Sequence, residues 1–246
     1  MRLPSMIEGR QFNWFWVALL ALLVSGCATS GAVENDPWEA FNRPMYRFNE
    51  KLDEYVAKPL ARGYQAITPA PVDRGISRFF ANLDDVQIAL NNLLQFKFRD
   101  ALSDAGRFGL NSTIGILGFL DVATGMGLEK HEEDFGQTLG KWGFPSGPYL
   151  VLPVLGPSSV RDAVGFAGDW VVNPIFVQID NADVSWSLYG LRYVDRRADL
   201  LKASRILQSA ALDPYSFIRD SYLQRRQSLV FDGSPPETEE NDFFIE

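Results

Sequence analysis

Apolar residues recur at helical spacing through most of the chain after residue 36. Between residues 38 and 55 they lie three or four positions apart, which predicts one stripe of an amphipathic helix. Pro44 interrupts the stripe, so we expect a kink or a split there, and we expect Pro59 to end the segment. Such a stripe is more often buried in a core than exposed in a channel. Its members are Trp38, Phe41, Met45, Phe48, Leu52 and Tyr55.

The same period predicts further helices along the chain. Asp-Pro pairs at 36–37 and 213–214 are typical of helix starts, because aspartate caps the first turn and proline has no backbone N–H to satisfy. On the longest of these helices the pattern places Leu191, Val194, Ala198 and Leu201 on the inward side. The expected ranges are about 72–83, 84–96, 99–111, 159–172, 184–211 and 213–231.

Two stretches break the helical pattern. Residues 108–128 are strongly apolar, but five glycines argue against one straight helix. We expect a helix, a turn and a short helix there, either buried or lying in a membrane interface. Residues 136–156 are rich in glycine and proline, and 149–152 has the composition of a short strand that a hairpin would pair. The predicted fold class is mainly α, a single multi-helix domain over residues 36–231 with room for one short β-hairpin.

Residues 1–26 have the features of a lipoprotein signal peptide. A basic start precedes the apolar run at 12–24, and small residues lead to Cys27, the only cysteine. Val-Ser-Gly-Cys has the form of a bacterial lipobox, which predicts cleavage before Cys27 and acylation of that residue. The alternative is an ordinary signal peptide followed by a free thiol. Two or more acyl chains would hold firmly to a membrane, with residues 27–35 as a lipidated tether.

Charge and composition narrow the function classes. The formal net charge is −8 at pH 7, which argues against a nucleic-acid binder. Cys27 has no second cysteine to pair with, so stability must come from a packed core. Residues 232–246 are acidic and contain two prolines, so we expect a disordered acidic tail. A basic zone at 191–226 contacts either lipid phosphates or an acidic partner, or it forms solvated helix faces, which base rates favour.

Little in the sequence supports catalysis. His131 is the only histidine, so a Ser-His-Asp triad would need it, and Ser146 lacks a nucleophile-elbow pattern. Adjacent carboxylates at 84–85 and 132–133 point different ways on a helix, and charge runs are usually solvated faces, which disfavours a glycosidase pair. We therefore expect a protein that is not an enzyme, with no catalytic residue, no metal site and no cofactor.

Five ordered stretches resemble the MlaA (VacJ) family of bacterial lipoproteins. They lie at 35–43, 131–140, 147–153, 156–162 and 213–215. The resemblance implies a ring-like helical body around a central amphipathic channel, held on the periplasmic side of the outer membrane, in its inner leaflet, in a Gram-negative bacterium. It also implies that phospholipids from the outer leaflet pass through this channel to a periplasmic lipid-carrier protein. Association with trimeric porins is a further implication.

The resemblance also suggests which residues meet the lipid and the membrane. We expect headgroups to pass near the first helix, and the glycine-rich apolar stretch together with a tryptophan to lie at the interface. Two other classes stay open, an envelope hydrolase such as a phospholipase or glycosidase, and a structural porin-associated lipoprotein. The lipid-path candidates are Phe41, Asn42, Arg43, Phe48 and Asn49, and the membrane-interface candidates are Leu117, Phe119, Leu120 and Trp142.

Overall fold

The structure is a computed structural model that describes residues 36–210 and 212–236. The predicted signal peptide, Cys27 and the tether at 27–35 lie outside these residues, as do positions 237–246 of the predicted tail. Across the described ranges, no helix combines the length and the apolarity that crossing a membrane requires.

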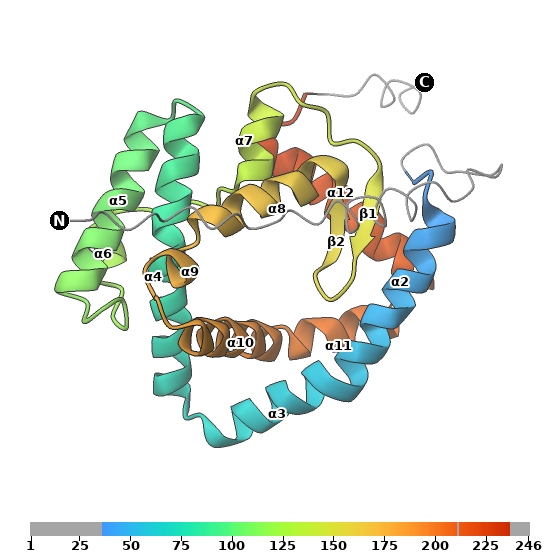
Figure 1. The fold of residues 1–246 in the computed structure, drawn as a ribbon, viewed down its shortest axis with the longest axis horizontal. Coiled ribbons are helices and arrows are strands. Elements are labelled where there is room, and N and C mark those ends of the chain that lie inside the picture. Colours follow the sequence, from blue (N-terminus) through green and yellow to red (C-terminus); the bar gives the residue numbers. More distant parts are fainter. Residues whose placement is uncertain (1–35, 211, 237–246) are drawn as a thin grey trace, which may run out of the picture.

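The helices form a ring that a single β-hairpin completes (Figure 1). In Figure 1, α2 and α3 bound one side, α4 stands opposite with α5 outside it, α10 and α11 run beside α3, and α8 lies across the top. This confirms the predicted mainly α single domain with one short hairpin. The elements are α2 (Glu39–Leu52), α3 (Lys58–Ile67), α4 (Ala70–Leu94), α5 (Phe98–Thr113), α6 (Val122–Gly125), α7 (Phe135–Lys141), β1 (Tyr149–Leu152), β2 (Gly156–Ser159), α8 (Val160–Val172), α9 (Pro174–Val177), α10 (Ala182–Asp199), α11 (Leu201–Ala210) and α12 (Pro214–Val230).

The first helical segment is longer than its prolines suggested. Pro44 lies inside α2, which continues past it to Leu52. A π-helical turn at Asp53–Ala57 then joins α2 to α3, and Pro59 sits in the first turn of α3. The prediction that Pro59 ends the segment was wrong, because the N–H that proline lacks is one that a first helical turn leaves unpaired.

The other expected helices are present with changed boundaries. The ranges 72–83 and 84–96 are one continuous helix, α4, and 184–211 is divided at Leu200 into α10 and α11. The stretch after 108 is the expected helix, turn and short helix. Helix α7 was missed, because seven residues are too few for a periodic signal. The hairpin is antiparallel, with Tyr149 opposite Ser159 and Leu152 opposite Gly156.

Within the described residues, buried apolar side chains form two small clusters. In the first, the predicted inward face of α10 is confirmed, since Ala198 is buried with Ala61 and Tyr64 of α3. The second joins Tyr149 and Val151 of the hairpin to Tyr215 of α12. The carboxylate of Asp36, which we expected to cap α2, instead accepts hydrogen bonds from Asn42 and from the Tyr215 hydroxyl. It therefore binds α2 to α12 and makes no side-chain cap on α2.

Polar and apolar side chains are distributed in reverse of the usual pattern. Among the described residues, buried side chains are more often polar or charged than apolar. Meanwhile Tyr55, Ile67, Phe96 and Leu102 are each 74–83% exposed. The predicted core stripe on α2 is wrong for the same reason, since Phe48 is also half exposed. Extensive exposed apolar surface of this kind indicates that the body contacts an apolar medium or partner rather than water alone.

Candidate functional site

A cavity of about 790 Å³ lies within the ring, between α4, residues 130–134, the hairpin, α8, α10 and α12. Its walls divide into an apolar part and a charged part, so it suits a ligand that has both characters. The apolar lining is Leu152, Val154, Leu155, Phe166, Trp170, Tyr189, Tyr193, Leu200 and Leu229. The charged lining is Asp84, Lys130, Glu132, Glu133, Asp134, Asp162, Asp169, Arg192, Arg196, Arg197, Arg225 and Arg226.

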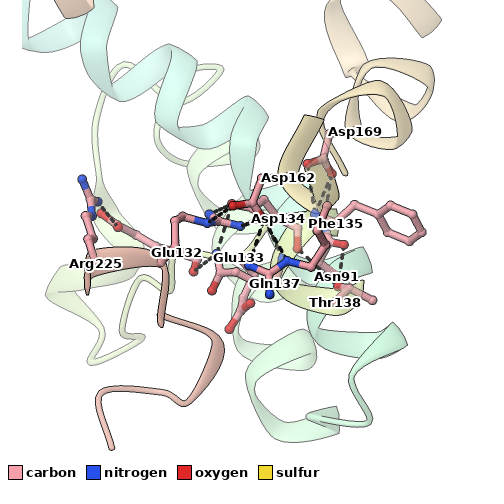
Figure 2. A network of polar contacts seen from close by, with 12 residues as sticks. Asn91, Glu132, Glu133, Asp134, Phe135, Gln137, Thr138, Asp162, Asp169 and Arg225 are labelled. Atoms are coloured by element: carbon pink, nitrogen blue, oxygen red, sulfur yellow. Dashed lines mark hydrogen bonds and ion pairs between the residues drawn. The ribbon is translucent and has the colours of Figure 1, made fainter. Parts of the chain in front are cut away.

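Arg226 of α12 is the centre of the buried charges. Its guanidinium Nη2 donates to Asp134 and to Asp162, the two carboxylates labelled in Figure 2, each at 2.9 Å. The Tyr222 hydroxyl donates to Asp162 at 2.7 Å. Burial by itself raises the pKa of the Asp162 carboxyl, but Arg226 and Tyr222 outweigh burial and hold this pKa below its ordinary value. Both carboxylates therefore stay ionised at neutral pH and fix α12 against α7 and α8.

A second buried chain of hydrogen bonds joins α4, α7 and α8. Asp169 of α8 accepts from the backbone N–H of Phe135 at 3.0 Å and from Asn91 Nδ2 at 3.1 Å (Figure 2). The Thr138 hydroxyl then donates to Asn91 Oδ1 at 2.8 Å. Asp134 caps α7 by accepting from the Gln137 N–H at 2.8 Å. The short α7 is therefore held at its first turn by side chains from two other helices.

Asp169 makes the stability of this region dependent on pH. Burial raises the pKa of its carboxyl to about 6, although the hydrogen bonds from Phe135 and Asn91 by themselves lower this pKa. The pKa of Asp169 is higher in the folded protein than in the unfolded chain. Its protonated carboxyl therefore contributes fully to the free energy of unfolding below about pH 4, and this contribution is lost as the pH rises through about 6. We expect the unfolding free energy of wild type, relative to Asp169→Asn, to fall by about 2–3 kcal/mol over that range. Urea unfolding at several pH values measures this, and a pH-independent difference contradicts it.

The wall of the cavity formed by α10 carries an arginine, Arg196, that is only loosely paired with a carboxylate. Arg192 of α10 donates to Asp84 of α4 at 2.6 Å. Arg196 lies 3.8 Å from the same carboxylate, and its side chain is 68% exposed. Two guanidinium groups thus share one carboxylate, which leaves Arg196 available to an anionic ligand. The basic zone seen in the sequence is therefore partly a cavity wall and not only a set of solvated helix faces.

The hairpin supplies the apolar wall nearest its own turn. Val154 and Leu155 follow β1 at this turn and line the cavity with about half of each side chain exposed. Val154 has a φ of 68°, in the left-handed region that β-branched residues avoid. Because surrounding contacts must hold such a conformation, the position of this wall is determined by tertiary structure.

The predicted lipid-path residues lie elsewhere, since none of the five is among the side chains that line the cavity. Asn42 is fully buried, accepting from the Val151 N–H at 2.9 Å and donating to the Tyr149 carbonyl at 3.0 Å. Asn49 makes the equivalent pair with Val154 N–H and the Leu152 carbonyl. The two amides therefore fasten the hairpin to α2, which corrects their expected role.

The other three candidates lie on or near the surface of α2. Arg43 donates to Asp213 at 2.7 Å, and Phe41 and Phe48 are about half exposed. Sequence reasoning missed the residues that do line the cavity, although the basic zone at 191–226 contained several of them. The four membrane-interface candidates, Leu117, Phe119, Leu120 and Trp142, are each between 42% and 65% exposed, and their role stays a prediction.

His131 lines the cavity without the partners that a nucleophile site needs. Its Nδ1 lies 3.0 Å from Asp104 Oδ2, and in the described chain no serine hydroxyl is hydrogen-bonded to it. Over the same ranges, no group of three or more His, Cys, Asp or Glu side chains is arranged to hold a metal ion. Asp232, the first residue of the predicted tail, pairs with Lys97 and with Lys141.

A helical ring with a charged and apolar interior and an apolar exterior defines a membrane-associated binding protein for amphipathic ligands. A family model described as MlaA lipoprotein matches residues 34–229, and the chain belongs to this family. It is 35% identical over 232 residues to the intermembrane phospholipid transport system lipoprotein MlaA of Escherichia coli (strain K12), covering 88% of each chain. The Haemophilus influenzae protein of the same name is 32% identical over 231 residues, covering 91% of this chain and 92% of that one.

The fold agrees with a solved relative. A structure from work on the structural basis for maintenance of bacterial outer membrane lipid asymmetry aligns with a TM-score of 0.69 and 32% sequence identity. The alignment covers 79% of this chain and 98% of that one. The ring is therefore a property that this chain shares with the family.

Proposed function

We propose that this protein is an outer-membrane lipoprotein that removes mislocalised phospholipids from the outer leaflet and passes them to a periplasmic carrier. In this way it maintains the lipid asymmetry of the outer membrane. The observation that carries the proposal is the amphipathic cavity within the ring, with Arg192 and Arg196 on one wall and Val154 and Leu155 on another. A phospholipid is divided in the same way, into a charged phosphate and apolar acyl chains.

Two further observations support this role. The relatives are named as lipoproteins of an intermembrane phospholipid transport system. The exposed apolar side chains on the outside of the body suit a position within one leaflet. Acylation of Cys27 would hold the ring on the periplasmic side of the outer membrane, and contact with trimeric porins would keep it there. The protein would act by binding and conducting lipid, without being an enzyme and without a cofactor.

The proposal predicts that the charge of Arg196 is needed for lipid clearance. Deleting the gene is expected to raise outer-leaflet phospholipid and sensitivity to detergent. Wild type restores both properties, whereas Arg196→Glu leaves them near the deletion level, because a carboxylate in the cavity repels the lipid phosphate. The exposed position of Arg196 keeps the effect on folding small. Surface labelling of phospholipid in the complemented strains gives the readout.

The matched control is Arg74→Glu, the same change at an exposed arginine of α4 that does not line the cavity. It is expected to restore clearance fully. Full clearance by Arg196→Glu would reject the cavity as the lipid path. If the protein were instead a hydrolase, lysophospholipid or glycan fragments would be released and His131→Ala would stop their release. If the protein were instead a purely structural porin-associated lipoprotein, Arg196→Glu would leave both lipid clearance and porin binding unchanged.

A further inference from the structure

A second, much smaller cavity lies between α3 and α11, and three of its five lining residues are cationic. It has a volume of about 90 Å³ and is lined by Lys58, Arg62, Leu201, Ser204 and Arg205, which we call the α3–α11 crevice. It shares no lining residue with the central cavity. In a chain with a formal net charge of −8, three cations around one small space require an explanation.

The acidic side chains of the described chain do not neutralise this crevice. Lys58 has one distant partner, Asp53, at 3.5 Å, and Asp53 is already bonded by Arg197 Nη2 at 2.8 Å. Over the described ranges, no carboxylate lies within ion-pair distance of Arg62 or Arg205. Cations that line one small space repel one another, so an anion between them stabilises the arrangement.

A buried donor beside the crevice also lacks an acceptor. Arg197 Nη2 donates to the Ser204 hydroxyl at 3.3 Å, and this hydroxyl lines the crevice. The other terminal nitrogen, Arg197 Nη1, is buried with no hydrogen-bond partner. The side chain of Arg197 is only 11% exposed, so water does not readily replace the missing acceptor. Arg197 itself lines the central cavity and not the crevice, so the acceptor oxygens of a bound oxyanion would meet Lys58, Arg62, Arg205 and the Ser204 hydroxyl.

The size and surroundings of the crevice indicate the ligand. A volume of about 90 Å³ exceeds the space for one water and is far too small for a whole lipid, but it accommodates a tetrahedral oxyanion. Arginine forks match phosphate oxygens, and lysine adds a point charge. Leu201 is the one apolar residue that lines the crevice, so the site suits the phosphate group itself more than an acyl chain.

We propose that the α3–α11 crevice is a phosphate-binding site, separate from the central cavity, that takes the phosphate of a lipid headgroup or free phosphate. A lipid bound there would hold the α3 side of the ring at headgroup level.

The test is ligand-dependent thermal stabilisation of the full-length lipoprotein in neutral detergent. The probes are inorganic phosphate and short-chain dihexanoyl phosphatidylglycerol, with chloride at matched ionic strength as the reference. We expect a saturable rise in the unfolding midpoint, because a ligand that binds only the folded state stabilises it. Arg62→Gln combined with Arg205→Gln is expected to weaken the apparent affinity at least about tenfold, and Arg74→Gln to leave it unchanged.

The two probes distinguish the source of the phosphate. A response to phosphatidylglycerol alone assigns a lipid headgroup, a response to both probes assigns the phosphate group from either source, and a response to phosphate alone assigns the free ion. Each of these outcomes supports phosphate binding at the crevice if the double variant loses the response. An absent wild-type response to both probes overturns the proposal. Phosphatidylglycerol is also titrated on an Arg196→Gln background, where lipid in the central cavity is weakened, and a response that the double variant keeps on this background overturns the proposal. A response lost in Arg196→Gln instead assigns binding to the central cavity and also overturns it.

Ser204→Asp keeps the proposal testable if the double variant does not fold. This change places a carboxylate among the three cations, where it would take the position of the ligand. We expect an unfolding midpoint at or above that of wild type and no response to inorganic phosphate. A Ser204→Asp protein that responds like wild type contradicts the proposal.

Discussion

Replacing Arg226 with methionine is expected to lower the free energy of unfolding by about 3–5 kcal/mol. Asp134 and Asp162 both accept from this one guanidinium, and the side chains of Arg226 and Asp162 are only 12% and 7% exposed. Removing the cation leaves two carboxylates facing each other with little water to solvate them. Denaturant unfolding of the detergent-solubilised protein measures the loss, and lipid clearance is expected to fail with it.

The neighbouring arginine is the natural control. Arg225 pairs with Glu132 at 2.9 Å, but both side chains are more than two-thirds exposed. Because exposed ion pairs contribute little, Arg225→Met is expected to change stability by less than about 1 kcal/mol. Equal losses for the two variants would show that the buried charges do not determine the packing of α12, which would contradict this account of the cavity wall.

Gly165→Ala is expected to destabilise the protein by at least about 2 kcal/mol. A Cβ at Gly165 of α8 would lie 2.4 Å from the backbone nitrogen of Gly136 and 2.5 Å from its Cα. Backbone atoms cannot move aside as a side-chain end can, so α7 and α8 must separate. The separation also disturbs Asp162 and Arg226, which lie within 2.8 Å of the Cβ position built at Gly136.

The contrasting substitution is Gly190→Ala in the exposed middle of α10. No atom lies within 4 Å of the Cβ position there, so alanine gains helix propensity without a clash. We expect stabilisation of about 0.5–1 kcal/mol. Thermal unfolding of both glycine variants compares the two sites, and destabilisation by Gly190→Ala would show that helix propensity is not the deciding term on this face.

The family motifs anticipated the ring but not the residues that line it. The motif at 35–43 predicts that Asn42 contacts headgroups, but Asn42 binds the backbone of a hairpin more than 100 residues away. Arg226 meets Asp134 and Asp162 across 92 and 64 positions. Such pairings leave no periodic signal, because they depend on how helices meet rather than on spacing along one helix.

The sequence by itself determined what local forces control. The helical spacing of apolar residues and the capping residues determine where most helices form. The starts of α8 at Ser159 and α12 at Asp213 are examples, because each cap needs only a residue two or three positions away. Only the tertiary structure decided which faces are buried. Where an apolar medium surrounds the body, an apolar stripe such as that of α2 no longer marks the core, and buried charge pairs between distant segments determine the interior instead.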